Sequence, residues 1–241
     1  MSQRAPGVPP ETHAAPALER WLTWHAIAMI AGACGAVISR RSAYVAVPAL
    51  ISFALLWRGR PPELPALRRG VGLANGLTAL RLSVVLLATA SMPRLGTAWV
   101  MAAFSLNVVL DAIDGYSARR LGAATSFGAL FDREVDAVFV LSAYLYFHLY
   151  SIGGLGPWVL LPGVLPYLYR LSVAALSAPV PSERKERLAA PLAAVNFVLL
   201  LGAVGLPAYA TPILAVSVSV VLLSFSASFW SLYRHAYSFS Q

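Results

Sequence analysis

All four aspartates of this 241-residue chain fall within one stretch of 26 residues that has apolar sequence on both sides. They are Asp111, Asp114, Asp132 and Asp136. An ionised carboxylate in or near a hydrocarbon layer costs roughly 2.5–3.5 kcal/mol on insertion scales. Because drift would not collect four such costly groups, the stretch is predicted to be a functional site.

The spacing within this stretch predicts two helices joined by a short turn. On the first helix, one arc of roughly 140° holds five residues: Asp111, Asp114, Gly115, Ala118 and Arg119. The second helix has a stripe with a four-residue period: Gly128, Asp132 and Asp136. Gly122 is typical of a helix C-terminus, and Thr125 or Ser126 of an N-cap. If the two helices fold back antiparallel, the first aspartate comes level with the fourth and the second with the third.

Four facing carboxylates cannot all stay ionised without cations, so they either take up protons or bind metal. An all-oxygen set with no Cys or His nearby suits Mg²⁺, Mn²⁺ or Ca²⁺ rather than zinc or copper. Two such ions form a clamp for displacement at phosphorus. Gly115 and Gly128 expose bare backbone beside the carboxylates, where a ligand or a neighbouring helix can approach closely.

The order of these residues resembles the signature of the CDP-alcohol phosphotransferases. Eight specified positions match without a departure, in the pattern D-x2-D-G-x2-A-R-x8-G-x3-D-x3-D. Those integral membrane enzymes transfer a phosphatidyl or similar phosphoalcohol group from a CDP-linked donor to an alcohol acceptor and release CMP. Within the family, the chain resembles the phosphatidylglycerophosphate and phosphatidylinositol-phosphate synthase types.

The resemblance implies a role for each matched position. The four aspartates gather the metals, expected to be two Mg²⁺ or Mn²⁺ ions, and Asp136 is also the base for the acceptor hydroxyl. Gly115, Ala118 and Arg119 shape the nucleotide and diphosphate pocket, with Gly128 beside them on the second helix.

The rest of the chain predicts a helical membrane protein. It is 59% hydrophobic and only 12% charged, with a mean hydropathy of +0.70, which excludes an ordinary soluble domain. The formal net charge of +8 is assigned to a membrane surface, and no nucleic-acid partner is expected. The single cysteine, Cys34, excludes an intramolecular disulfide and a Cys-based metal cluster.

Eight apolar segments predict an all-α, polytopic membrane bundle of about eight transmembrane helices. They are residues 21–38, 43–57, 72–91, 96–118, 126–150, 157–178, 189–207 and 211–232. The expected organisation is a mobile, proline-rich cytoplasmic arm at 1–20, a two-span extension at 21–57 and a six-span catalytic core at 70–235. Only the core is covered by the family resemblance. For the extension, packing or partner binding is the only role that we predict.

The distribution of Lys and Arg predicts the orientation in the membrane. With the N-terminus inside, twelve of these residues fall in inside segments, and three in outside segments. This positive-inside bias places both termini and the turn of the aspartate hairpin in the cytoplasm. The expected location is a bacterial inner membrane.

Three further arginines fall inside predicted spans, where ionisable residues are functional candidates: Arg81, Arg133 and Arg170. Asn75, Thr78 and Arg81 step around one helix three residues at a time. This motif is similar to one that many family members carry beside the nucleotide, which implies a donor-binding role. The expected partners of all three arginines are the aspartates or a ligand phosphate. The alternative is a helix–helix contact with an arginine that reaches the interface.

The candidate acceptor-binding residues are basic: Arg133, Arg170, Arg184, Lys185 and Arg187. In family members whose acceptor carries a phosphate, an arginine in the fourth core helix and basic residues at the start of the fifth form an anion pocket, which this set resembles. Guanidinium groups bind phosphate bidentately, whereas a neutral alcohol needs no such cluster. The positive-inside rule explains the basic loop equally well, and Arg133 could pair with a nearby carboxylate or a lipid phosphate.

These features predict a phospholipid-biosynthetic transferase with CDP-diacylglycerol as donor and a phosphorylated polyol such as glycerol 3-phosphate as acceptor. An acceptor without phosphate, such as serine, inositol or a lipid alcohol, is the alternative. Membrane lipid is an expected partner, and the resemblance implies a homodimer. A cation transporter would carry carboxylates along other spans, and this chain does not. The complete motif opposes a catalytically inactive scaffold.

Overall fold

The computed structural model describes residues 16–58, 73–94, 96–121, 126–150, 155–176 and 186–238. These residues form eight α-helices and no strand, so the all-α prediction is confirmed. The helices are α1 (Pro16–Ser39), α2 (Ala43–Arg58), α3 (Leu73–Ser91), α4 (Thr97–Leu121), α5 (Ser126–Leu149), α6 (Leu161–Leu176), α7 (Glu186–Gly205) and α8 (Ala210–Ser238). Short 3₁₀ turns precede three of them: η2 (Met92–Arg94), η3 (Pro157–Leu160) and η4 (Pro207–Tyr209).

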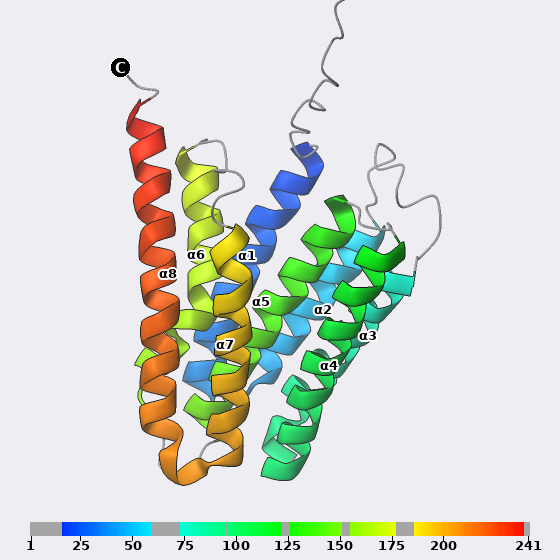
Figure 1. Ribbon diagram of the computed structural model, residues 1–241, viewed down its shortest axis with the longest axis vertical. Helices are drawn as coiled ribbons and strands as arrows, with labels where there is room; N and C mark the ends of the chain where they lie inside the picture. Colours follow the sequence, from blue (N-terminus) through cyan, green and yellow to red (C-terminus); the bar gives the residue numbers. More distant parts are fainter. Residues whose placement is uncertain are drawn as a thin grey trace, which may run out of the picture.

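Successive helices run in opposite directions along the bundle (Figure 1). The N-terminal end of α1 and the C-terminal end of α8 lie at the same end of the molecule, together with the C-terminal end of α4 and the N-terminal end of α5. An even number of crossings would produce this arrangement.

Several helices have the length and composition of membrane spans. Four segments are long and apolar enough to cross a membrane: Ala17–Ser39, Asn75–Arg94, Pro157–Leu176 and Pro207–Arg234. Three shorter apolar helices accompany them: Ala43–Arg58, Thr97–Ile113 and Pro191–Gly205. Large apolar side chains such as Leu87, Val198 and Leu223 are exposed on the outside of the bundle, as expected for a lipid-facing surface. The chain is therefore a helical membrane protein.

Helix α5 is the central helix of the bundle. It packs against α3 and α6, and residues 141–148 are all buried. A helix that is apolar on all sides is stable only inside such a packed core. The charged residues of α5 lie in its N-terminal half, and the buried C-terminal half fixes the position of the helix within the bundle.

The predicted aspartate hairpin is more open than two helices packed side by side. Among the described residues, α3 packs extensively against both α4 and α5, whereas α4 and α5 contact each other little. The expected pairing of Asp111 with Asp136 is nevertheless present, since one carboxylate oxygen of each lies within 4.8 Å of the other. Arg81 of α3 pairs with carboxylates on both of the other helices.

Helices α1 and α2 form an antiparallel hairpin that is tied to the rest of the bundle. A Cβ at Gly32 would clash with the backbone oxygen of Tyr44, so the two helices approach closely at this point. In the turn between them, Ser42 donates from its Oγ to the Thr89 carbonyl oxygen at 2.5 Å and from its N–H to the Tyr150 hydroxyl at 3.2 Å.

Helix α1 begins at Pro16, so residues 16–20, expected to belong to the mobile arm, are helical. Proline suits the first turn of a helix because the amide hydrogen that it lacks would have no partner there. The rest of the arm, residues 1–15, lies outside the described residues.

A buried triad of polar side chains joins helices α5, α7 and α8. The Tyr144 hydroxyl donates to Asn196 Oδ1 at 2.7 Å and lies 2.6 Å from Ser217 Oγ. Ser217 Oγ also donates to Asn196 Oδ1 at 2.6 Å. Because each polar atom in an apolar interior needs a partner, the triad aligns α5, α7 and α8 with one another.

Candidate active site

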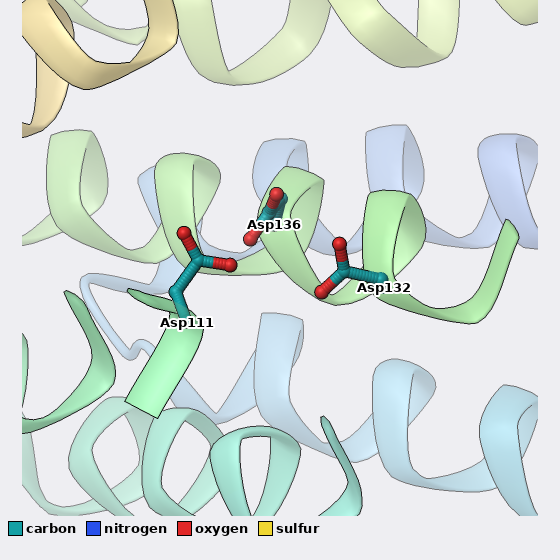
Figure 2. A group of neighbouring side chains, drawn as sticks. All are labelled: Asp111, Asp132 and Asp136. Atoms are coloured by element: carbon teal, nitrogen blue, oxygen red, sulfur yellow. The ribbon is translucent and has the colours of Figure 1, made fainter. Parts of the chain in front are cut away.

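Three of the four aspartates converge although they come from two helices (Figure 2). Asp111 is on α4, and Asp132 and Asp136 are on α5, one turn apart. One carboxylate oxygen from each lies within 4.8 Å of the others. The backbone of Asp114 belongs to α4, but its side chain lies outside the described part of the chain.

The cluster lies within the bundle, below the end that carries both described termini. Asp111 is ten residues before the end of α4, and Asp136 is ten residues after the start of α5. At a rise of 1.5 Å per residue, both are about 15 Å from those helix ends. The carboxylates are nevertheless partly open, since 33% of the side-chain surface of both residues is exposed.

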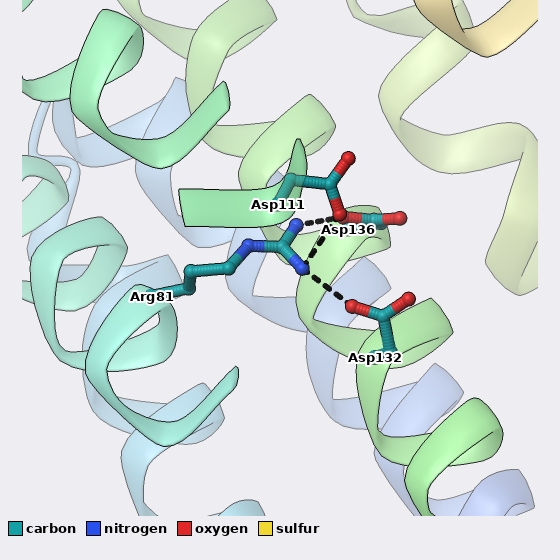
Figure 3. Close-up of polar contacts among 4 residues, drawn as sticks. All are labelled: Arg81, Asp111, Asp132 and Asp136. Carbon is teal, nitrogen blue, oxygen red and sulfur yellow. Dashed lines mark hydrogen bonds and ion pairs between the residues drawn. The ribbon is translucent and has the colours of Figure 1, made fainter. Parts of the chain in front are cut away.

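Arg81 of α3 is the cation of this cluster (Figure 3). Its side chain is completely buried, and its Nη1 lies 2.8 Å from Asp111 Oδ1. The same nitrogen pairs with Asp132 Oδ1, and Nη2 pairs with Asp136 Oδ1. One planar guanidinium thus joins α3, α4 and α5, as the five-donor geometry of arginine permits.

The cluster has the donor set of a divalent-cation site. Three carboxylates and one guanidinium carry a net formal charge of −2. Each carboxylate contacts Arg81 through Oδ1, and the second oxygen points away from the guanidinium (Figure 3). Closely spaced carboxylate oxygens of this kind suit Mg²⁺ or Mn²⁺, and the arginine leaves one oxygen of each group for such an ion.

The remaining candidates for the donor site are on α3, α4 and α5, and the structure describes the side chains of only some of them. Asn75 and Thr78 are on α3 within two turns of Arg81, and Thr78 is buried. Gly128 is on α5, one turn before Asp132. The backbones of Gly115, Ala118 and Arg119 continue α4, while the side chains of Ala118 and Arg119 are outside the described set.

Arg170 reaches α5 but contacts its other face. Its Nη2 lies 2.5 Å from Glu134 Oε1, and Glu134 is buried. A step of two residues turns a helix by about 200°, so Glu134 points to the side of α5 nearly opposite both Asp132 and Asp136. The arginine therefore lies at the interface between α5 and α6.

The other acceptor candidates are only partly described. Arg133 follows Asp132 on α5, and its side chain is exposed. Arg184 and Lys185 lie outside the described residues, and of Arg187 only the backbone, in the first turn of α7, is described.

Glu134 was not predicted as a site residue. It lies between two aspartates in the sequence, and the pattern of charges alone does not say which neighbouring helix each faces. The helical period could have shown that Glu134 faces a different helix from the aspartates, because it puts residue 134 about 160° from residue 136. An arginine inside the next span, Arg170, was its natural partner.

The fold and the site together define a helical membrane protein with a carboxylate cluster whose oxygens are close enough to hold a metal ion. A family model described as CDP-alcohol phosphatidyltransferase matches residues 71–229. The chain therefore belongs to this family, and the predicted resemblance is confirmed at the level of the family. Its members transfer a phosphatidyl group from a CDP-alcohol and use divalent metal ions. No curated protein and no solved structure matches the chain.

Proposed function

We propose that this transferase uses CDP-diacylglycerol as donor and a phosphorylated polyol, such as glycerol 3-phosphate, as acceptor. The observation that carries the proposal is the partly exposed cluster of Asp111, Asp132 and Asp136, held by Arg81 inside a membrane bundle. A lipid-linked diphosphate could reach such a site from the bilayer, and a water-soluble acceptor from the nearby end of the bundle.

In this proposal Asp136 accepts the proton of the acceptor hydroxyl. The acceptor oxygen forms a bond to the phosphatidyl phosphorus while the bond from that phosphorus to the bridging oxygen of CMP breaks. CMP leaves with the electron pair of the broken bond. Arg81 holds Asp136 at the centre of the site, because its guanidinium is in direct contact with that carboxylate.

The aspartates would hold divalent cations, which we propose to be two Mg²⁺ or Mn²⁺ ions, with Asp114 as the fourth ligand. When bound, these ions would neutralise negative charge on the diphosphate. The donor is proposed to bind to two residues of α3, Asn75 and Thr78, and to three of α4, Gly115, Ala118 and Arg119. Gly128 would give the donor close access to α5.

The acceptor phosphate is assigned to the remaining basic candidates. Arg133 is exposed beside Asp132, and the segment with Arg184, Lys185 and Arg187 leads into α7. Arg170 is also proposed to contact the acceptor phosphate, although it pairs with Glu134. Its ion pair with Glu134 engages one of five guanidinium N–H donors, and 23% of its side chain is exposed.

The proposed setting is a bacterial inner membrane with both termini in the cytoplasm, and the proposed assembly is a homodimer. Two observations support the placement of both termini on one side of the membrane. The N-terminal end of α1 and the C-terminal end of α8 lie at the same end of the bundle, and the sequence has a positive-inside bias.

The first test is CMP release by the purified chain from CDP-diacylglycerol with Mg²⁺ or Mn²⁺, against glycerol 3-phosphate, inositol phosphate, serine and inositol. Turnover should require metal and a phosphorylated acceptor. Asp136→Asn should lose about 100-fold or more, the range of a general base. Turnover with serine or inositol alone would overturn the proposed acceptor class. Silence with every acceptor, despite metal binding, would favour another CDP-linked donor or a non-catalytic scaffold.

A second test concerns Arg170. If it contacts an acceptor phosphate, Arg170→Ala should raise the KM for glycerol 3-phosphate at least about tenfold, the effect of losing a charge-assisted hydrogen bond, with little change in the KM for donor. Arg133→Ala, measured in parallel, tests the exposed arginine in the same way. An equal effect of Arg170→Ala on both substrates would contradict the role in acceptor binding.

A further inference from the structure

Asn107 is a polar residue of α4 that the proposed mechanism does not use. The residue is 0% exposed, and both of its polar side-chain atoms, Oδ1 and Nδ2, have no hydrogen-bond partner among the described residues. An asparagine inside a membrane bundle usually bonds to a neighbouring helix. Leucine, which has nearly the same size and shape, would avoid the cost of two unpaired polar atoms. Packing between helices therefore does not explain this residue.

Asn107 lies one helical turn before Asp111. The two residues differ by about 40° around α4, and Asn107 is about 6 Å farther from the C-terminal end of the helix. Side chains on a helix lean toward its N-terminus, so the Asp111 carboxylate lies over the turn that contains Asn107. The amide is therefore next to the carboxylate cluster, on its side toward the interior of the bundle.

The contacts of its neighbours show which way this face of α4 points. Phe104, three residues before Asn107, packs edge-on against Phe139 and Tyr146 of α5, with ring centroids 5.3 Å and 6.2 Å away. Asp111, four residues after Asn107, clusters with the two aspartates of α5. The three α4 residues lie within an arc of about 60°. Asn107 thus lies between an apolar contact and the carboxylates, and both neighbours face α5.

The spacing suits an ion that keeps bound water. Each clustered carboxylate has one oxygen turned away from Arg81, where an ion can bind (Figure 3). Mg²⁺ holds several waters at about 2.1 Å, and such a water forms hydrogen bonds of about 2.8 Å. A group about 5 Å from the ion is therefore within reach through one water, a distance close to one helical turn. A water bound to a metal donates hydrogen bonds, and Asn107 Oδ1 is an unused acceptor.

We propose that Asn107 is a further residue of the cation site, whose Oδ1 accepts a hydrogen bond from a water bound to the ion. The inference rests on the cation-binding role proposed for the aspartates. It extends the site one turn deeper than the matched sequence signature, which begins at Asp111. It also adds a neutral oxygen to a site whose other proposed ligands are all charged.

The test is Asn107→Leu in the full chain, which removes both polar atoms and keeps the size of the side chain. Mn²⁺ affinity, measured by calorimetry without donor or acceptor, should weaken roughly tenfold, the lower end of the range for residues that bond to a metal's ligands. The Tm in detergent with EDTA should stay the same or rise, because two unpartnered polar atoms have been removed.

Two further variants keep the result decisive. Asn107→Asp retains an oxygen at this position and adds a negative charge, so it should bind Mn²⁺ at least as tightly as the wild type while its Tm in EDTA falls. Ser142→Ala is the matched control. Ser142 Oγ is also a buried atom without a partner among the described residues, but it lies six residues beyond Asp136 on α5. Its Mn²⁺ affinity should equal that of the wild type.

Wild-type Mn²⁺ affinity in Asn107→Leu would overturn the inference, and with metal-dependent CMP release it would leave the proposed function standing. An equal loss in Ser142→Ala, weaker binding in Asn107→Asp, or a loss in Asn107→Leu that comes with a lower Tm in EDTA would also overturn it. A tenfold loss in Asn107→Leu alone, in a protein that releases no CMP with any acceptor, would support the inference while the proposed function failed.

Discussion

The guanidinium of Arg81 is completely buried, yet its carboxylate partners are each a third or more exposed. Three negative charges within hydrogen-bonding distance of one cation repel one another, and the arginine offsets this repulsion where water cannot do so fully. When no metal is bound, it is therefore the main force that keeps the three carboxylates together.

We expect Arg81→Ala to lower the stability of the metal-free protein by about 1–3 kcal/mol, less than the loss for a fully buried ion pair because the partners are partly solvated. Saturating Mn²⁺ should restore much of this stability, since a cation then replaces the missing charge. The measurement is Tm in detergent with Mn²⁺ and with EDTA.

Arg81→Lys is the control, because it keeps the charge but loses the planar fork. It should be intermediate in stability and still impaired in CMP release. Equal Tm values for the wild type and Arg81→Ala in EDTA would show that the arginine does not hold the cluster.

At the residue scale, the helical period was sufficient to predict that Asp111, Asp132 and Asp136 would converge. The place of Arg81 inside a span predicted that it would face aspartates or a phosphate. The helical period was not sufficient to predict which group Arg170 contacts. Its place inside a span was predicted, but its partner was not, because the choice between Glu134 and a ligand phosphate depends on how α6 is rotated against α5. That rotation is set by packing between helices and not by any spacing within one.

The interface between α5 and α6 depends on one glycine. A Cβ at Gly163 would lie 2.7 Å from the Cα of Leu141, a backbone atom that cannot move aside. The two helices can approach as they do only because this position has no side chain.

We expect Gly163→Ala to destabilise the protein by about 1–3 kcal/mol through overpacking. Gly202→Ala on α7 is the matched control, because a Cβ there has nothing within 4 Å. It should be neutral or stabilising by up to about 1 kcal/mol, since alanine favours the helix. Tm values in one detergent distinguish the two. A Gly163→Ala protein as stable as Gly202→Ala would show that the helices can separate at no cost.

At the element scale, the apolar segments predicted all eight helices to within a few residues at most ends. The position of α3 between α4 and α5 was not predicted. Periodicity identifies the buried face of a helix, but it does not say which helix covers that face. The turn predicted between α4 and α5 made these two helices antiparallel, but it did not indicate that α3 would pack against both of them.

For the whole molecule, the carboxylate cluster links α4 to α5, two helices that otherwise contact each other little among the described residues. A cation shared by both helices should therefore stabilise the entire bundle. By linkage, an ion at about 100 times its Kd adds about 2.7 kcal/mol to stability.

We expect Mn²⁺ or Mg²⁺ to raise Tm, and EDTA to reverse the shift. Asp111→Asn and Asp132→Asn should each abolish most of the shift, because each removes one charged ligand. Glu19→Gln, at an exposed position on α1, should respond to metal as the wild type does. A metal-induced shift that survives both aspartate substitutions would place the cation elsewhere.

The hydrogen bonds between α1 and α2 also have a consequence for biosynthesis. Trp21 Nε1 donates to the Ser52 carbonyl oxygen at 2.9 Å, and His25 Nδ1 lies 2.8 Å from the Ser52 hydroxyl. These groups therefore find partners within a hairpin that leaves the ribosome before α5 and α6 do. The hairpin can enter the bilayer as a unit before α5 and α6 have been synthesised, and the later helices then assemble against a template that is already in the membrane.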